Sequence, residues 1–179
     1  VPSLSVGIND YDGWTPVTGN AALRWQPADL WRLSFDLGRE LVETPLAIQN
    51  RITVDVAAVG VEYRLPPRWG FAAALSNLSF SDGNDRRRIT GKMDYALRFG
   101  NPRIVVGVEG GAFNDSLPAS FRSPPSAGTT TPKGYWNPKD YAEARVFAGI
   151  YAENQPWEWY GRIALGISRE TDGDGVSFN

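Results

Sequence analysis

Charged side chains that could contact a ligand recur at every second position within the apolar runs of this sequence. The set contains both carboxylates and cations: Arg24, Arg32, Asp36, Glu62, Arg64, Lys92, Asp94, Arg98, Glu109, Glu143, Arg145 and Arg162. Residues at this spacing lie on one face of a β-strand. From such a face they can hydrogen-bond the hydroxyl groups of a ligand, or they can pair with one another across neighbouring strands.

The sequence gives little support for catalysis. It contains no histidine and no cysteine, so it has no imidazole for a catalytic triad and no His- or Cys-ligated metal site. Carboxylates such as Asp36 and Glu62 could form a glycosidase pair, but the alternation places them along a wall rather than in a cleft. Neither a glycine-rich phosphate loop after a strand nor a metal-ligand spacing occurs. We predict a non-enzyme without a metal or cofactor.

The strand pattern that must position these charges is clearest between Arg88 and Phe113. Apolar or aromatic residues from Ile89 to Phe99 alternate with polar ones, and the apolar face resumes at Ile104 after a Gly-Asn-Pro turn. In a soluble sandwich the polar face of such a strand meets water. In a transmembrane barrel the apolar face meets lipid and the charged face lines the lumen.

Similar alternation continues along the chain. It predicts further strands at residues 4–8, 20–26, 31–37, 52–65, 69–78, 140–151 and 157–169, with another beginning at Val176. The connections are alternately short and long. The short ones contain Pro27, Pro66, Pro102 and Pro156, and the long or polar ones cover residues 10–19, 39–51, 79–87, 114–138 and 170–175. Outer-membrane barrels have this asymmetry, with short periplasmic turns and longer outer loops.

Aromatic residues gather beside the short turns. We predict that six of them form an interfacial girdle: Trp25, Trp31, Trp69, Phe99, Trp157 and Trp159. A row of indoles at one level is typical of a membrane interface. The alternative is a Trp-rich layer at one end of a soluble sandwich, but a sandwich has no reason to segregate its turn lengths so strictly. The pattern favours an all-β fold, an antiparallel up-and-down transmembrane β-barrel.

The strand count bears on closure of the barrel. The sequence contains about nine strands and the start of a tenth, whereas a closed barrel must pair its last strand with its first. An open strand edge is not viable in lipid. We therefore predict that residues 1–179 are a single β-barrel domain or barrel segment, most specifically an incomplete arc of a larger barrel.

Three stretches together resemble a known family. They are residues 39–55 (RELVETPLAIQNRITVD), 80–87 (FSDGNDRR) and 134–141 (GYWNPKDY). They resemble the carboxyl-terminal barrel of exopolysaccharide-export porins of the poly-N-acetylglucosamine exporter type and, more distantly, the cellulose-export porin. The resemblance implies a pore in the bacterial outer membrane for polysaccharide transport. It also implies an exopolysaccharide chain as substrate and a periplasmic helical-repeat region or further strands, from the same or another chain, as partners.

Within such a lumen we expect ten charged residues to contact the substrate: Asp36, Glu62, Asp94, Glu109, Arg32, Arg64, Lys92, Arg98, Arg145 and Arg162. The four acids are favoured for transport because a partly deacetylated amino-sugar polymer is cationic, and a net acidic channel would attract it. The alternative is that these charges only pair across strands and stiffen the wall.

Other partners are expected at the surface. Outer-membrane lipid should contact the apolar face. The basic run Arg86–Arg88 either contacts anionic lipopolysaccharide or is a solvated loop end balanced by Asp82 and Asp85. The formal net charge of −2 gives no argument for nucleic acid. Two other functions stay open at this point: a soluble carbohydrate-binding β-sandwich, and a structural barrel subunit of a larger envelope complex.

Overall fold

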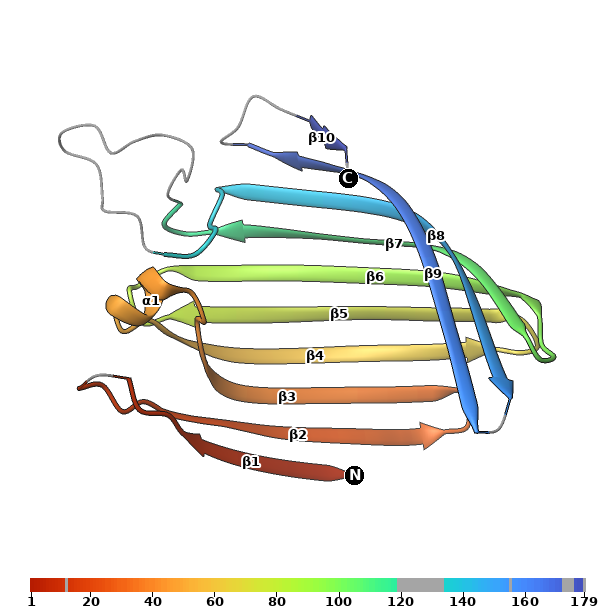
Figure 1. Cartoon of the computed structure of the whole chain (residues 1–179), viewed down its shortest axis with the longest axis horizontal. Helices are drawn as coiled ribbons and strands as arrows, with labels where there is room; N and C mark the ends of the chain where they lie inside the picture. The colour runs from red at the N-terminus through yellow and green to blue at the C-terminus, as the bar shows by residue number, and fades with distance from the viewer. Residues whose placement is uncertain (12, 119–133, 155, 172–175, 179) are drawn as a thin grey trace.

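The computed structural model describes residues 1–11, 13–118, 134–154, 156–171 and 176–178, without the side chains of the last three. Ten strands form one antiparallel sheet in which each strand pairs with the next along the chain (Figure 1). The strands are β1 (Pro2–Ile8), β2 (Val17–Ala28), β3 (Trp31–Leu41), β4 (Thr53–Leu65), β5 (Trp69–Phe80), β6 (Asp85–Arg98), β7 (Arg103–Asp115), β8 (Asp140–Asn154), β9 (Trp157–Glu170) and β10 (Val176–Phe178). The predicted all-β, up-and-down topology is confirmed. Parts of four predicted connections, at residues 12, 119–133, 155 and 172–175, lie outside the described residues.

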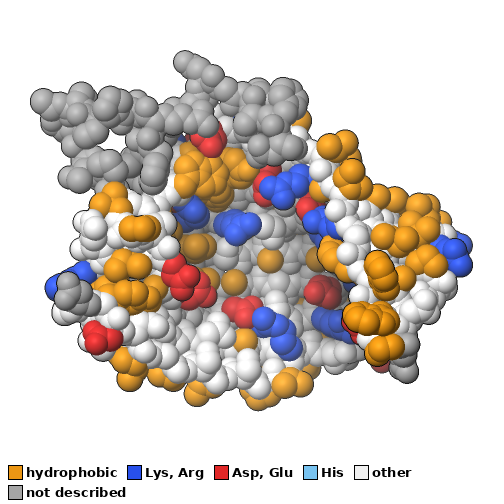
Figure 2. Space-filling model, viewed as in Figure 1, with side chains coloured by type: hydrophobic (Ala, Val, Ile, Leu, Met, Phe, Trp, Pro, Cys, Tyr) orange, Lys and Arg blue, Asp and Glu red, His pale blue; other side chains and the backbone are white. Residues whose placement is uncertain are grey.

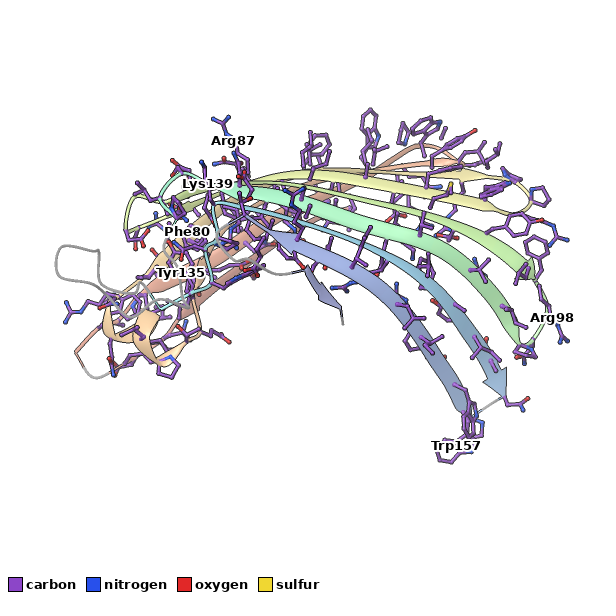
Figure 3. All side chains as sticks on the ribbon, turned by 90° about the horizontal axis from the view of Figure 1, so that it is seen from above. Phe80, Arg87, Arg98, Tyr135, Lys139 and Trp157 are labelled. Carbon is purple, nitrogen blue, oxygen red and sulfur yellow. The ribbon has the colours of Figure 1, made fainter. Side chains whose placement is uncertain are left out.

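The sheet is an open, curved arc. Its order runs from β1 to β10, and within the described residues these two edge strands pair only with β2 and β9. Figure 2 looks into the hollowed, concave face, and Figure 3 shows the curvature from above. Because every strand belongs to this one sheet, no second layer is present in the described residues to form a sandwich. The arrangement confirms the predicted incomplete arc of a barrel.

Strand alternation gives the two faces opposite chemistry. The convex face carries large apolar side chains that the protein itself leaves uncovered, among them Leu75, Ile89 and Leu165, which are 55%, 54% and 66% exposed. A soluble sheet would bury such a face against another layer. The concave face carries the charges. This division is that of a barrel wall, with lipid outside and an aqueous lumen inside.

The main buried cluster lies at the end of the sheet where the long connections are. A short helix, α1 (Pro45–Gln49), begins there after Thr44, whose hydroxyl accepts a hydrogen bond of 3.2 Å from the Ala47 backbone N–H. This N-cap and the proline in the first turn explain why a helix starts here. The sequence predicts a long connection at residues 39–51, and α1 lies within it. The cluster packs Ala47, Ile52, Val54, Phe80 and Tyr135 together.

One register row shows how the concave face accommodates long side chains. Arg64, Gly70, Asp94, Gly107 and Phe147 lie side by side on five successive strands. A Cβ atom on Gly70 would lie 2.5 Å from Arg64 Nη1 and 2.8 Å from Asp94 Oδ2, and one on Gly107 would lie 2.6 Å from the Phe147 ring. The glycines therefore let the neighbouring side chains lie flat across the sheet, and Arg64 reaches Asp94 over β5 at 3.3 Å.

Leu75→Arg tests the assignment of the two faces. Leu75 lies between Val59 and Ile89 on the convex face, so a charge there should destabilise the barrel by about 2–4 kcal/mol in a bilayer. Ala74→Arg is the matched control, because Ala74 faces the concave side between Gly60 and Thr90. The yield of folded protein in purified membranes measures both variants. Equal loss in the two variants, or no loss in Leu75→Arg, would contradict the assignment.

Arg64→Met tests the pairing of a buried carboxylate. The Asp94 side chain is only 8% exposed, so removal of its closest cation leaves a charge without good solvation. We expect the free energy of unfolding to fall by about 1–3 kcal/mol, measured by denaturant titration of the protein in lipid vesicles. Arg32→Met should cost less than about 1 kcal/mol, because its pair with the half-exposed Glu62 spans 4.0 Å. Adding Asp94→Asn to Arg64→Met should recover much of the lost free energy of unfolding. Equal losses in Arg64→Met and Arg32→Met would contradict the explanation.

Candidate functional site

The concave face brings most of the predicted site residues together. Nine of the ten predicted lumen-facing charges occupy the alternate positions that line it: Asp36, Glu62, Asp94, Glu109, Arg32, Arg64, Lys92, Arg145 and Arg162. Figure 2 shows acidic and basic side chains around the hollow of this face. The alternation of β-strands is the physical reason, since successive side chains point to opposite faces.

Arg98 is the exception, and its predicted place in the lumen is wrong. A register shift lies between Ala96 and Arg98, so that Arg98 is opposite Ile104 rather than Arg103. Ile104 shares its face with the outward-facing Val106 and Val108 on β7, and Arg98 hydrogen-bonds the Asn101 carbonyl in the adjoining turn at 3.4 Å. A bulge displaces the alternation by one position, and sequence periodicity alone does not reveal it.

Each favoured carboxylate has a basic neighbour. Asp36 pairs with Arg24 at 2.7 Å, Glu62 with Arg32 at 4.0 Å, and Glu109 with Arg162 at 2.6 Å. Asp94 lies between Arg64 at 3.3 Å and Lys92 at 4.0 Å. All of these pairs except Lys92–Asp94, which lies within β6, cross between strands, so they are set by strand order and register. The concave face therefore presents charges of both signs, and the four favoured carboxylates all lie beside cations.

The four carboxylates differ in their access to a ligand. The side chain of Glu62 is 51% exposed, compared with 26% for Asp36, 23% for Glu109 and 8% for Asp94. The ion pair of Glu62 with Arg32 spans 4.0 Å, whereas each of the other three carboxylates has a cation at 3.3 Å or closer. Glu62 is thus the carboxylate that a ligand in the lumen can reach most readily, while Asp94 belongs to the wall itself.

A hollow of about 390 Å³ lies at the centre of the concave face. Its charged lining comes from Glu62, Arg88, Glu109, Glu143 and Arg145, and its remaining lining is small: Ser34, Gly60, Ala72, Ala74 and Thr90 among others. Small residues leave the space, and the charged ends around it supply donors and acceptors. The lining suits a hydroxyl-rich ligand better than an apolar one. Sequence reasoning identified the charges but missed the small residues between them.

At the end of the sheet with the long connections, residues 134–137 pack against the concave face. Tyr135 stacks on Phe80 with ring centroids 4.3 Å apart, and its hydroxyl donates to Asp82 at 2.9 Å. Burial raises the pKa of the Tyr135 phenol, and the hydrogen bond to the Asp82 carboxylate raises it further. The phenol is therefore held protonated against Asp82. This contact ties residues 134–137 to the sheet near α1.

A buried polar network extends from the same place. Asn84 donates to Asp115 at 2.9 Å, and Arg86 binds the same carboxylate at 2.8 Å and the Trp136 carbonyl at 2.6 Å. Arg86 also lies 4.1 Å from the Phe113 ring centroid. These groups satisfy one another, and they fix the segment at Trp136 over the concave face. The sequence contained each residue, but nothing in its spacing showed that they meet.

Five of the predicted girdle residues, Trp25, Trp31, Trp69, Trp157 and Trp159, lie at convex-face positions, and Phe99 follows the end of β6. The six side chains are between 39% and 69% exposed. Tyr63, Phe71 and Tyr95, which sequence reasoning did not include, join them. Trp31 lies 4.5 Å from Tyr63 and Trp69 lies 4.8 Å from Tyr95, ring centroid to ring centroid. The aromatic surface at this end is therefore broader than the tryptophans alone suggest.

Comparison with known proteins agrees with this geometry. A solved structure described as "Bacterial polysaccharide outer membrane secretin" superposes with a TM-score of 0.79 and 14% sequence identity, over 98% of this chain and 58% of that chain. The likeness shows a shared fold, and this chain spans a little over half of that protein. No curated protein matches the chain.

The family assignment rests on a separate comparison. The family model described as "PgaA membrane beta barrel domain" matches residues 4–160. The match confirms the predicted resemblance to a polysaccharide-export barrel and the membrane setting inferred from the alternation. The chain belongs to the PgaA membrane beta barrel domain family.

Proposed function

We propose that this chain forms part of the wall of a bacterial outer-membrane pore through which an exopolysaccharide leaves the cell. The observation that carries the proposal is the hollow on the concave face, lined by charged groups and small residues on the inner side of a membrane-barrel arc. The solved structure with the same fold is described as a polysaccharide secretin, which supports the same class of substrate.

The composition of the lining suits transport rather than tight binding. A conducting channel must let its substrate enter but hold it weakly enough to release it. Ion pairs such as Arg162–Glu109 and Arg145–Glu143 keep their charged ends in place. Sugar hydroxyls can exchange hydrogen bonds along such a wall without displacing any one pair. We infer a passive pore, with no catalytic step assigned to the chain.

The charge of the substrate bears on Glu62. Asp36, Asp94 and Glu109 are engaged by close cations, but Glu62 is half-exposed beside the hollow. An ammonium group of a partly deacetylated amino-sugar polymer could pair with it as the chain passes. We therefore narrow the expected electrostatic contact from four carboxylates to Glu62.

A structural barrel subunit without a transport role is the other function that the sequence left open. Its wall would need paired charges as well. It would not need open space between them, and the small residues around the hollow favour the pore.

Ala74→Trp tests whether the hollow is the route of the polymer. The indole would project into the hollow from β5, so we expect a several-fold loss of secreted polymer and a lower single-channel conductance of the intact protein. Ala73→Trp is the control, because Ala73 borders the hollow but its side chain lies on the convex face, between Val61 and Gly91. Wild-type secretion and conductance in Ala74→Trp, with the barrel assembled, would favour the structural role.

Glu62→Gln tests the electrostatic contact. The substitution keeps the size and removes the charge, so it should lower secretion of a partly deacetylated polymer several-fold and leave a fully acetylated one unaffected. Glu62→Asp keeps the charge and should behave as wild type. The two polymers are quantified in the culture medium of matched strains. Unchanged secretion of the cationic polymer by Glu62→Gln would contradict an electrostatic contact between Glu62 and the polymer.

A further inference from the structure

The basic run Arg86–Arg88 is divided between the two faces of β6. Arg86 is engaged by Asp115 and by the Trp136 carbonyl, and Arg88 lines the concave hollow. Arg87 lies between them in sequence, and its side chain projects outward from the convex face (Figure 3). Its side chain is exposed and has no ion pair among the described residues. One arginine of the three is therefore available to a partner outside the barrel.

Arg87 lies at the border of the apolar surface. In the register it is flanked by Asn77 on β5 and Asn114 on β7. The next outward-facing row holds Leu75, Ile89 and other apolar residues. From Arg87 to the aromatic Tyr95 on the same strand is about 27 Å of extended chain, close to the height of the apolar band of a barrel before strand tilt. Arg87 thus lies at the headgroup level, at the end of the sheet with the long connections.

Two depressions on the convex face flank Arg87 and share it as a lining residue. The first, of about 670 Å³, has apolar walls from Phe35, Leu37, Val59, Leu75 and Ile89. The second, of about 550 Å³, lies on the other side of Ile89. Its lining includes the small Ala112 and Ala142, the cation of Arg169, the carboxylate of Asp140, and the polar Asn114 and Thr171. A cation between two shallow grooves in an apolar surface is complementary to a phosphate that carries several acyl chains.

We propose that Arg87 binds a phosphate group of an outer-leaflet glycolipid of the lipid A type, with acyl chains in the two flanking depressions. A guanidinium group binds phosphate through two parallel hydrogen bonds. Arg169 supplies a second cation at the far side of the second depression. The amides of Asn77 and Asn114, on either side of Arg87, can hydrogen-bond sugar hydroxyls, which favours a glycolipid over a phospholipid. The inference depends on the membrane setting and not on the transported substrate.

The experiment uses the intact native protein that carries this chain, purified in detergent, freed of lipid and titrated with diphosphorylated lipid A. Native mass spectrometry measures the fraction of protein with bound lipid. We expect Arg87→Ala to weaken binding about tenfold, the loss of a charge-assisted contact, and Arg87→Lys to weaken it less. Arg88→Ala should bind as wild type, because Arg88 also borders the first depression but its side chain lies on the lumen side. A change in migration on an SDS gel between unheated and boiled samples, as for the wild type, confirms that each variant is folded.

The outcomes separate clearly. Wild-type affinity in Arg87→Ala, or equal losses in Arg87→Ala and Arg88→Ala, would overturn the site. Equal binding of dephosphorylated lipid A would overturn the phosphate contact. Competition by phosphatidylglycerol as strong as that by lipid A would overturn the glycolipid assignment. Polymer secretion by Arg87→Ala reports on the pore independently, so failure of this site and failure of the export function are distinguishable.

Discussion

A backbone amide in hydrocarbon must find its hydrogen-bond partner within the protein, and this constraint governs the whole structure. The ladder from β1 to β10 meets it for every strand except along its two edges. Pairing in a ladder forces side chains to alternate between faces. One strand therefore carries two chemistries at once, apolar residues against lipid and charged residues against water. The concave hollow, the convex aromatics and the position of Arg87 are all consequences of that alternation.

Charge pairing is the second organising feature, and it depends on glycine. Arg32 and Glu62 pair at the same level on neighbouring strands, whereas Arg64 reaches Asp94 across β5. Long side chains at adjacent positions would crowd one another, but Gly70 and Gly107 leave room between Arg64, Asp94 and Phe147. The wall can thus be rigid and still leave an open bore. Its charge is distributed as pairs, so a ligand meets both signs along its path.

The sequence predicted what period-two alternation controls. The strands, their faces and the asymmetry of the turns follow from the pattern of Leu33, Phe35 and similar residues. Arg98 was misplaced because a bulge shifts the register without changing the sequence pattern. The particular ion pairs could not be predicted, because the pairing of Glu109 with Arg162 depends on the order and register of three strands. The Tyr135 contact was missed because it joins segments far apart in the chain. The helix α1 has a local signal, Thr44 followed by Pro45, which the alternation of strands does not reveal.

The assignment of the concave face to an aqueous lumen is the central claim, and the chain suits a direct test because it contains no cysteine. Single cysteines introduced along β5, from Trp69 to Phe80, would be labelled in membranes with a water-soluble maleimide. The account predicts fast labelling at Ala72, Ala74 and Ser76, and slow labelling at Phe71, Ala73 and Leu75. Uniform labelling along the strand, or the opposite alternation, would contradict it.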